Sequence, residues 1–315
     1  MMELRSALVV GCTGFVGQAL TRRLISEGVT TYSVVFLDRP RRTTPACELI
    51  ECETNSAAAI ARALDGRVFD AVFHLAAAGV MPDRRDPQAL LAGNVALVTS
   101  VLEAMKNAPP GIFVYAGSCA EYSTAVAPNR ITEDHPTCPV DLYGAAKAST
   151  TIWASALARA LRIPFVTLRL FHIFGPGEAP SRLIPYLAHS LSDNAVARLT
   201  GGEQLRDFLY IDDVVNAFLA AARHPLEPYS VYNVCSAEPV SVRSAAEMLA
   251  CVMGASLGNL HFGALPYRPN EEMWIVGDNQ RFVQATAWSP TLSLKSGLTR
   301  YVENQYLGTM DKVGN

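Results

Sequence analysis

Short apolar runs alternate with longer helical patterns through the first half of the chain. In the helical stretches apolar residues recur every three or four positions, as Leu20 and Leu24 do before Gly28, a residue type that commonly ends helices. Strands that are apolar throughout are buried on both faces, which is typical of a parallel sheet between two layers of helices. The pattern predicts a doubly wound parallel α/β sheet of the Rossmann type. Its expected helices include 18–27, 88–106 and 143–161, and its expected strands are 7–10, 33–37, 69–75, 112–115 and 165–171.

The second half of the chain has shorter elements, interrupted by prolines such as Pro176, Pro180 and Pro266. We expect residues 1–172 to form a dinucleotide-binding domain, to which about 206–240 return. Residues 173–205 and 241–315 are expected to form a smaller substrate-binding region over the ligand-binding edge of the sheet.

Composition narrows the class of protein. Half of the 315 residues are hydrophobic and 17% are charged, which excludes an intrinsically disordered chain. The net charge of −3 provides no basic excess, and no apolar run reaches the ~20 residues of a membrane helix, so neither nucleic acid nor membrane is an expected partner. The seven cysteines contain no C-x-x-C pair, so we expect no metal site and a reducing, cytoplasmic location.

A glycine-rich turn follows the first strand. Gly11, Gly14 and Gly17 enclose Phe15 and Val16 in the spacing G-x-x-G-x-x-G. Such glycines permit a tight turn, close approach of the backbone to a diphosphate, and close packing of the next helix, whose N-terminal N–H groups attract phosphates. A turn without a ligand is the alternative, but the preceding strand and following helix favour a dinucleotide site.

The residues after the second strand bear on which dinucleotide is bound. Asp38 suits the ribose hydroxyls of NAD, whereas the adjacent Arg39 could accept the extra phosphate of NADP. Because a carboxylate would repel that phosphate, NAD is favoured over NADP.

A tyrosine and a lysine stand four residues apart in an expected helix. Tyr143 and Lys147 therefore share a helix face, where the ammonium would favour the phenolate and make Tyr143 a general acid or base. Ser118 follows the strand 112–115, at the edge where doubly wound sheets bind ligands, and its hydroxyl could hold a substrate oxygen.

These motifs resemble the extended short-chain dehydrogenase/reductases that act on nucleotide sugars, the NAD-dependent epimerase/dehydratase family. The glycine turn, the segment His74-Leu75-Ala76-Ala77, Asn94, and Ser118 with Tyr143 and Lys147 all match that family. The resemblance implies that the cofactor contacts Leu75, Ala76, Ala77 and Asn94 as well as the glycine turn. It also implies a homodimer.

The resemblance extends to the second half. The segment around Arg206-Asp207-Phe208 and the segment Arg268-Pro269-Asn270-Glu271 match the family, and imply that Arg206 and Arg268 contact the diphosphate of the substrate. His172 stands where the family usually has an asparagine that touches the substrate phosphate. The chain departs from the 4,6-dehydratases of the family, which carry an Asp-Glu pair where this chain has Cys119 and Ala120. A variant dehydratase would have to use Cys119 or Glu121 as an auxiliary acid or base.

The resemblance implies an enzyme that exchanges hydride at C4 of a nucleotide-diphosphate sugar with a bound nicotinamide. A 4-epimerase is the leading interpretation, followed by a 4-ketoreductase of 4-keto-6-deoxy sugars and then by a variant dehydratase. A regulator that binds a dinucleotide without catalysis is the alternative from another class. It is disfavoured because Ser118, Tyr143 and Lys147 are all present.

Overall fold

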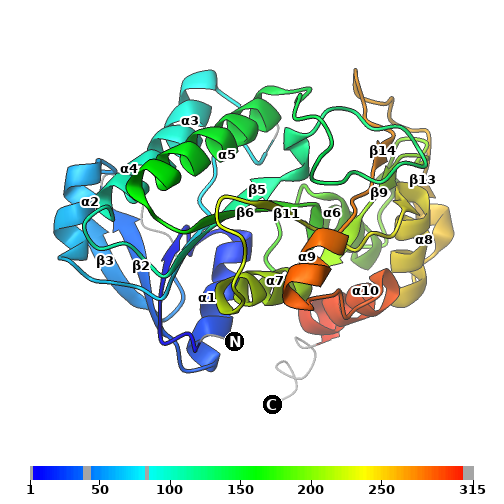
Figure 1. The fold of residues 1–315 in the computed structure, drawn as a ribbon. Coiled ribbons are helices and arrows are strands. Elements are labelled where there is room, and N and C mark those ends of the chain that lie inside the picture. Colours follow the sequence, from blue (N-terminus) through cyan, green and yellow to red (C-terminus); the bar gives the residue numbers. More distant parts are fainter. Residues whose placement is uncertain (1–2, 38–43, 82–84, 308–315) are drawn as a thin grey trace, which may run out of the picture.

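The computed structural model describes residues 3–37, 44–81 and 85–307, and it contains the predicted doubly wound sheet (Figure 1). All neighbouring strands of this sheet are parallel, in the order β11-β6-β5-β4-β1-β2-β3. The order reverses between β1 and β4, which is where open α/β sheets bind ligands. The strands are β1 (Ser6–Val10), β2 (Thr30–Phe36), β3 (Glu48–Cys52), β4 (Ala71–His74), β5 (Ile112–Ser118), β6 (Phe165–Leu170) and β11 (Val231–Val234).

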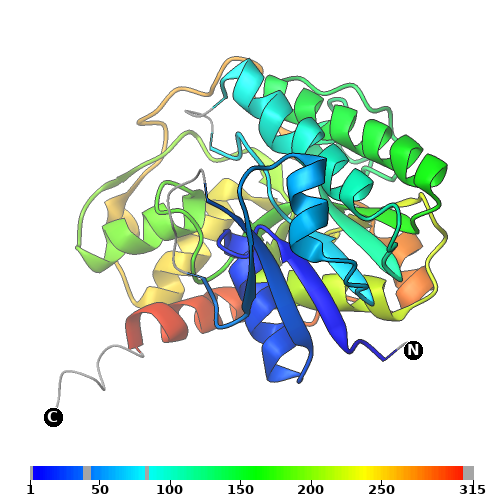
Figure 2. The same ribbon diagram turned by 90° about the vertical axis from the view of Figure 1, so that its left-hand side faces the viewer.

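Two hydrophobic cores lie on opposite faces of the sheet, because successive strand residues point to opposite sides. Ala7 and Val9 of β1 belong to one core, and Leu8 and Val10 belong to the other. Figure 2 shows the strands between the two layers of helices. The first core is covered by α1 (Phe15–Ser26), α7 (Ile211–Arg223) and α9 (Gln280–Thr286), and the second by α2 (Ala57–Leu64), α4 (Leu97–Ala104) and α5 (Leu142–Leu161).

Two elements differ from the sequence-based expectation in ways that affect the site. The strand expected at 112–115 continues to Ser118, because β5 and β6 stay paired as far as Ser118 and Leu170. The helix expected at 88–106 consists of α3 (Pro87–Leu91) and α4, joined by a π-helical turn over Ala92–Ala96.

The C-terminal elements pack around a third core and gather on the right of Figure 1. Their helices are α6 (Leu183–Ser192), α8 (Val242–Met253) and α10 (Leu294–Val302). Their short strands are β7 (His172–Phe174), β8 (Ala197–Arg198), β9 (Leu205–Arg206), β10 (Phe208–Tyr210), β12 (Val240–Ser241), β13 (Leu260–His261) and β14 (Trp274–Ile275). Three single turns complete the fold: η2 (Cys119–Glu121), η3 (Leu257–Asn259) and η4 (Glu303–Leu307).

β11 lies in the main sheet beside β6, although it follows several C-terminal elements in the chain. The boundaries of the expected substrate-binding region stay a prediction. Within the described ranges, no helix combines the length and the apolar character needed to cross a membrane.

Candidate active site

One cavity of about 2300 Å³ connects the glycine turn after β1 with the C-terminal elements. A pocket for one drug-sized ligand usually measures about 300–1000 Å³, so this cavity has room for two ligands side by side. Its lining includes the turn residues 10–17, the ends of β2, β4 and β5, the start of α5, and residues from α6, β8 and the loop before β14.

The glycine turn has the geometry of a diphosphate cradle. Gly11 has φ of +100°, and a Cβ atom there would lie 2.6 Å from the Ala76 nitrogen. A Cβ atom on Gly17 would overlap the Gly11 carbonyl oxygen, so both glycines are required for close packing. Gly14 caps α1 without a side-chain hydrogen bond, and the first turn of α1 carries no acidic residue. Phe15, Val16 and Gly17 line the cavity at this helix N-terminus, which therefore fits an anionic ligand.

The other expected cofactor contacts divide into three groups. Leu75, Ala76 and Ala77 line the cavity beside the glycine turn. Asn94 does not line it: this buried residue lies in the π-helical turn and exchanges hydrogen bonds of 3.3 Å with the backbone of Ala78. Its amide thus holds the loop that follows β4. Asp38 and Arg39 lie outside the described residues.

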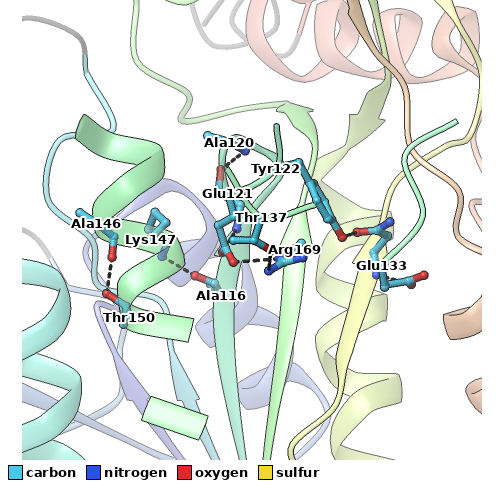
Figure 3. Close-up of polar contacts among 12 residues, drawn as sticks. Ala116, Ala120, Glu121, Tyr122, Glu133, Thr137, Ala146, Lys147, Thr150 and Arg169 are labelled. Carbon is cyan, nitrogen blue, oxygen red and sulfur yellow. Dashed lines mark hydrogen bonds and ion pairs between the residues drawn. The ribbon is translucent and has the colours of Figure 1, made fainter. Parts of the chain in front are cut away.

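Ser118, Tyr143 and Lys147 come together at the carboxyl end of β5. Lys147 Nζ donates to the Ala116 carbonyl oxygen at 2.5 Å (Figure 3). It also lies 4.3 Å from the centre of the Tyr115 ring. The Ser118 side chain hydrogen-bonds Tyr143. A Cβ atom on Gly144 would overlap the Ala120 carbonyl oxygen, so this glycine lets α5 approach η2, the turn that follows Ser118, closely.

The pKa values in this cluster are dominated by burial. Burial raises the pKa of Tyr143 to about 12, although the hydrogen bond from Ser118 acts in the opposite direction. Burial lowers the pKa of Lys147 to about 8, opposed by the negative charge of Glu121. In the protein without ligands, desolvation of Tyr143 is therefore the larger effect and keeps its phenol protonated. The stabilisation of the phenolate by Lys147 stays a prediction.

Neither candidate auxiliary residue is placed as an acid or base. Cys119 lines the cavity, but burial raises its pKa to about 12, so its thiol stays protonated. Glu121 is fully buried and does not line the cavity, because its carboxylate pairs with Arg169 at 2.8 Å. Ala120 offers no ionisable group.

His172, Arg206 and Arg268 all line the part of the cavity formed by C-terminal elements. Burial, then Arg206 and Arg182, keep the pKa of His172 well below its usual range, so the ring is neutral and adds no charge. Its Nδ1 atom has no hydrogen-bond partner. Arg206 is only 7% exposed and pairs with Glu271 at 2.6 Å. It makes no pair with the neighbouring Asp207, which accepts hydrogen bonds from Ser236, Ala237 and Gly277.

The cavity also contains charged residues that the sequence did not single out. Arg182 and Arg198 line it, and so does Glu178, whose pKa burial raises to about 7. Arg182 stands at the start of α6 and Arg198 ends β8. Their positions in loops and at strand ends could have identified these charged residues, because such segments carry the ligand contacts of doubly wound folds. In the described part of the chain, no group of three or more His, Cys, Asp or Glu residues is arranged to hold a metal ion.

Comparisons with known proteins agree with this geometry. CDP-abequose synthase of Salmonella typhimurium is 36% identical over 140 residues, which is 43% of this chain and 46% of that protein. UDP-glucose 4-epimerase of Lactobacillus helveticus is 24% identical over 90% of this chain and 91% of its own length. The structure of MoeE5 with UDP-glucose and NAD has a TM-score of 0.83 and 26% identity, covering 98% of this chain and all of that one. The family model for the NAD dependent epimerase/dehydratase family matches residues 7–235. The chain belongs to the NAD-dependent epimerase/dehydratase family.

Proposed function

We propose that the protein is an NAD-dependent 4-epimerase of nucleotide-diphosphate sugars. The observation that carries this proposal is the convergence of Ser118, Tyr143 and Lys147 in one cavity with the glycine turn. The relative named UDP-glucose 4-epimerase and the similar structure that holds both UDP-glucose and NAD support it.

The residues around the glycine turn fit a dinucleotide. Gly11, Gly14 and Gly17, with the N–H groups of Phe15 and Val16, would hold the diphosphate of NAD, because backbone can approach it closely there. Leu75, Ala76 and Ala77 would form the wall beside it, and Lys147 with Tyr143 would contact the nicotinamide ribose. Asp38 and Arg39 remain the predicted adenosine contacts. When bound, NAD supplies the acceptor and donor of hydride for sugar C4.

Three side chains would act on the C4 oxygen of the sugar. Ser118 Oγ already accepts a hydrogen bond from the Ala120 N–H at 3.2 Å, which leaves the Ser118 hydrogen free to be donated. Tyr143 would take the proton from the C4 hydroxyl and return it. Lys147, still largely cationic at neutral pH, would stabilise the phenolate while the proton is away.

The C-terminal side of the cavity would hold the nucleotide. Arg206 and Arg268 offer charge-assisted hydrogen bonds to a diphosphate, and the neutral His172 offers a single donor. Because Arg206 pairs with Glu271, a bound phosphate would either share the guanidinium of Arg206 with that carboxylate or displace the carboxylate from it.

A 4-ketoreductase is the second candidate, since it needs the same three residues. The lack of an available acid or base at Cys119 and Ala120 favours it over a variant dehydratase. A dehydratase needs an acid and a base near C5 and C6 of the sugar. The Cys119 thiol is protonated and Glu121 is engaged by Arg169.

We also propose a cytoplasmic homodimer. Ile152 and Trp153 on α5 are 65% and 53% exposed, and Leu91 at the end of α3 is 50% exposed. Exposed apolar side chains on helices that pack together, as α3 and α5 do, are typical of a protein–protein interface, and a second copy of the chain would bury them. A reducing compartment would keep the seven cysteines as free thiols.

The experiment that tests the proposal identifies the nicotinamide released when freshly purified protein is denatured. Near-stoichiometric NAD, measured by mass spectrometry, is the expected result, because an epimerase regenerates its cofactor in each cycle. Protein without nicotinamide, together with consumption of added NADH or NADPH by a 4-keto sugar, would replace the epimerase with the ketoreductase.

A further inference from the structure

A buried ion pair lies directly behind the candidate catalytic serine. Glu121 ends the turn η2 and is 0% exposed, and Arg169 of β6 is 4% exposed. Arg169 Nε donates to Glu121 Oε2 at 2.8 Å (Figure 3). Neither residue lines the cavity, so neither can touch a ligand in it.

The other oxygen of Glu121 holds Ser118. Glu121 Oε1 accepts a hydrogen bond of 2.8 Å from the Ser118 N–H, while Ser118 Oγ accepts from the Ala120 N–H at 3.2 Å. Together the two bonds form a capping box around η2. They fix the Ser118 backbone and the position of its hydroxyl oxygen. The partner of this hydroxyl is Tyr143.

Arg169 anchors the carboxylate from the neighbouring strand. In the pairing of β5 with β6, Arg169 lies opposite Gly117, the residue before Ser118. Its guanidinium lies 4.3 Å from the centre of the Tyr122 ring, and Nη2 donates to Thr137 Oγ1 at 3.3 Å. A Cβ atom on Gly117 would lie 2.7 Å from Glu121 Oε1, so glycine is the residue that leaves room for the carboxylate.

Stability alone does not account for this pair. Taking two charges out of water is costly, and well-packed hydrophobic residues in place of a buried ion pair are often neutral or stabilising. The pair lies one hydrogen bond from Ser118, which indicates a role in the site.

We propose that Glu121 and Arg169 are positioning residues that aim the Ser118 hydroxyl at the C4 oxygen of the substrate. They act through the Ser118 N–H and the turn η2, and never contact the sugar. The inference rests on the proposed function for the identity of the substrate oxygen.

The test replaces both charges at once, because removal of one partner would strand a buried charge and risk unfolding. The double variant Glu121→Leu/Arg169→Met is expected to fold and to retain its cofactor, with a modest loss of thermal stability because the buried Ser118 N–H loses its acceptor. The turnover number is expected to fall roughly 10- to 100-fold, the loss typical of a misplaced catalytic group. The matched control, Glu133→Gln/Arg281→Met, removes a more exposed ion pair of 3.6 Å that does not line the cavity, and it is expected to keep its turnover.

Adding Ser118→Ala to the double variant shows whether the ion pair acts through Ser118 or stabilises the site in some other way. If the pair acts through Ser118, turnover of Ser118→Ala and of the triple variant agrees within about twofold. A double variant with wild-type turnover, or losses that multiply in the triple variant, would overturn the proposal.

A second readout does not depend on activity. Hydrogen exchange at the Ser118 amide should be slow in the wild type and faster in the double variant, because its acceptor is gone. Unchanged protection would also overturn the positioning role. Failure of the proposed function looks different: the wild type would exchange nothing at C4, while the loss of Ser118 protection would still be seen.

Discussion

At the scale of single residues, burial moves the pKa values of Tyr143 and Lys147 apart. Tyr143 has a pKa of about 12 and Lys147 a pKa of about 8, so in the absence of ligands the phenol is protonated and the lysine is largely cationic at neutral pH. The phenol therefore begins as a proton donor, and it can accept a proton only while positive charge is near. Lys147 provides that charge from the next turn of the same helix.

Removal of the Tyr143 hydroxyl tests its role. Tyr143→Phe is expected to lower the turnover number ~10²–10⁴-fold, the usual range for a lost general acid or base. Steady-state kinetics measures this, with circular dichroism to verify folding. Tyr32→Phe is the matched control, since that ring packs against Phe69 at 5.5 Å, away from the cavity, and should leave turnover unchanged. Near-normal turnover of folded Tyr143→Phe would remove Tyr143 from the mechanism.

The lowered pKa of Lys147 predicts a pH dependence. As pH rises through about 8, Lys147 loses its proton and the phenolate loses its stabilising cation, so turnover should fall on the alkaline side. Lys147→Arg should work at a lower maximal rate but lack this decline between pH 7.5 and 9.5, because guanidinium keeps its charge there. A wild-type profile that stays flat across this interval would contradict the assignment.

At the scale of elements, the end of β5 organises the site. Ala116 holds Lys147, Gly117 leaves room for Glu121, and Ser118 faces Tyr143. Three consecutive residues of one strand thus set the positions of groups from α5, η2 and β6.

Contact between α5 and η2 depends on Gly144. Gly144→Ala should push the helix away from the Ala120 carbonyl, destabilising the fold by about 1–3 kcal/mol and lowering turnover. Thermal unfolding and kinetics would measure both effects. Gly258→Ala is the control, because that exposed glycine has only the Ser256 hydroxyl within 4 Å. A fully active and stable Gly144→Ala would show that the close approach is not required.

Much of this element-level arrangement follows from local patterns. Apolar runs and glycine spacing predicted the parallel sheet, the cofactor turn and the helix of Tyr143. The strand β3 was not expected, because Glu48 and Glu51 interrupt its apolar residues near one edge of the sheet. The π-helical turn at Ala92–Ala96 was missed because a 3.6-residue period does not reveal one inserted residue.

Roles that depend on distant partners could not be read from the chain. Glu121 was a candidate auxiliary acid until Arg169, 48 residues away, was found beside it. Asn94 was a candidate cofactor contact, but its amide holds Ala78. The choice between a ligand contact and an internal hydrogen bond depends on tertiary packing, which the local sequence does not encode.

At the scale of the whole molecule, one prediction concerns assembly. The double variant Ile152→Glu/Trp153→Glu should convert a dimer into monomers, because two buried carboxylates would oppose association. Light scattering coupled to gel filtration measures the mass directly. Val68→Glu changes another apolar residue, 62% exposed between α2 and β4, and should leave the mass unchanged. A wild type that runs as a monomer would contradict the proposed dimer.

The cavity reaches from the main sheet to the C-terminal elements. It runs from the glycine turn, at the reversal of strand order, to Arg268 before β14. A dinucleotide and a nucleotide sugar can therefore meet at Ser118 and Tyr143. In a 4-epimerase the hydride leaves C4 and returns to the same carbon from the other face, without exchange of the cofactor.

The most direct test follows a deuterium atom at C4. Purified protein, without added cofactor, would be incubated with glucose deuterated at C4 and linked to UDP, dTDP, GDP or CDP, and the products read by NMR. The account predicts that one of these sugars becomes its C4 epimer with deuterium retained at C4. Epimer that has lost the label, or no conversion of any of the four while a 4-keto sugar is reduced by added NADH or NADPH, would contradict it.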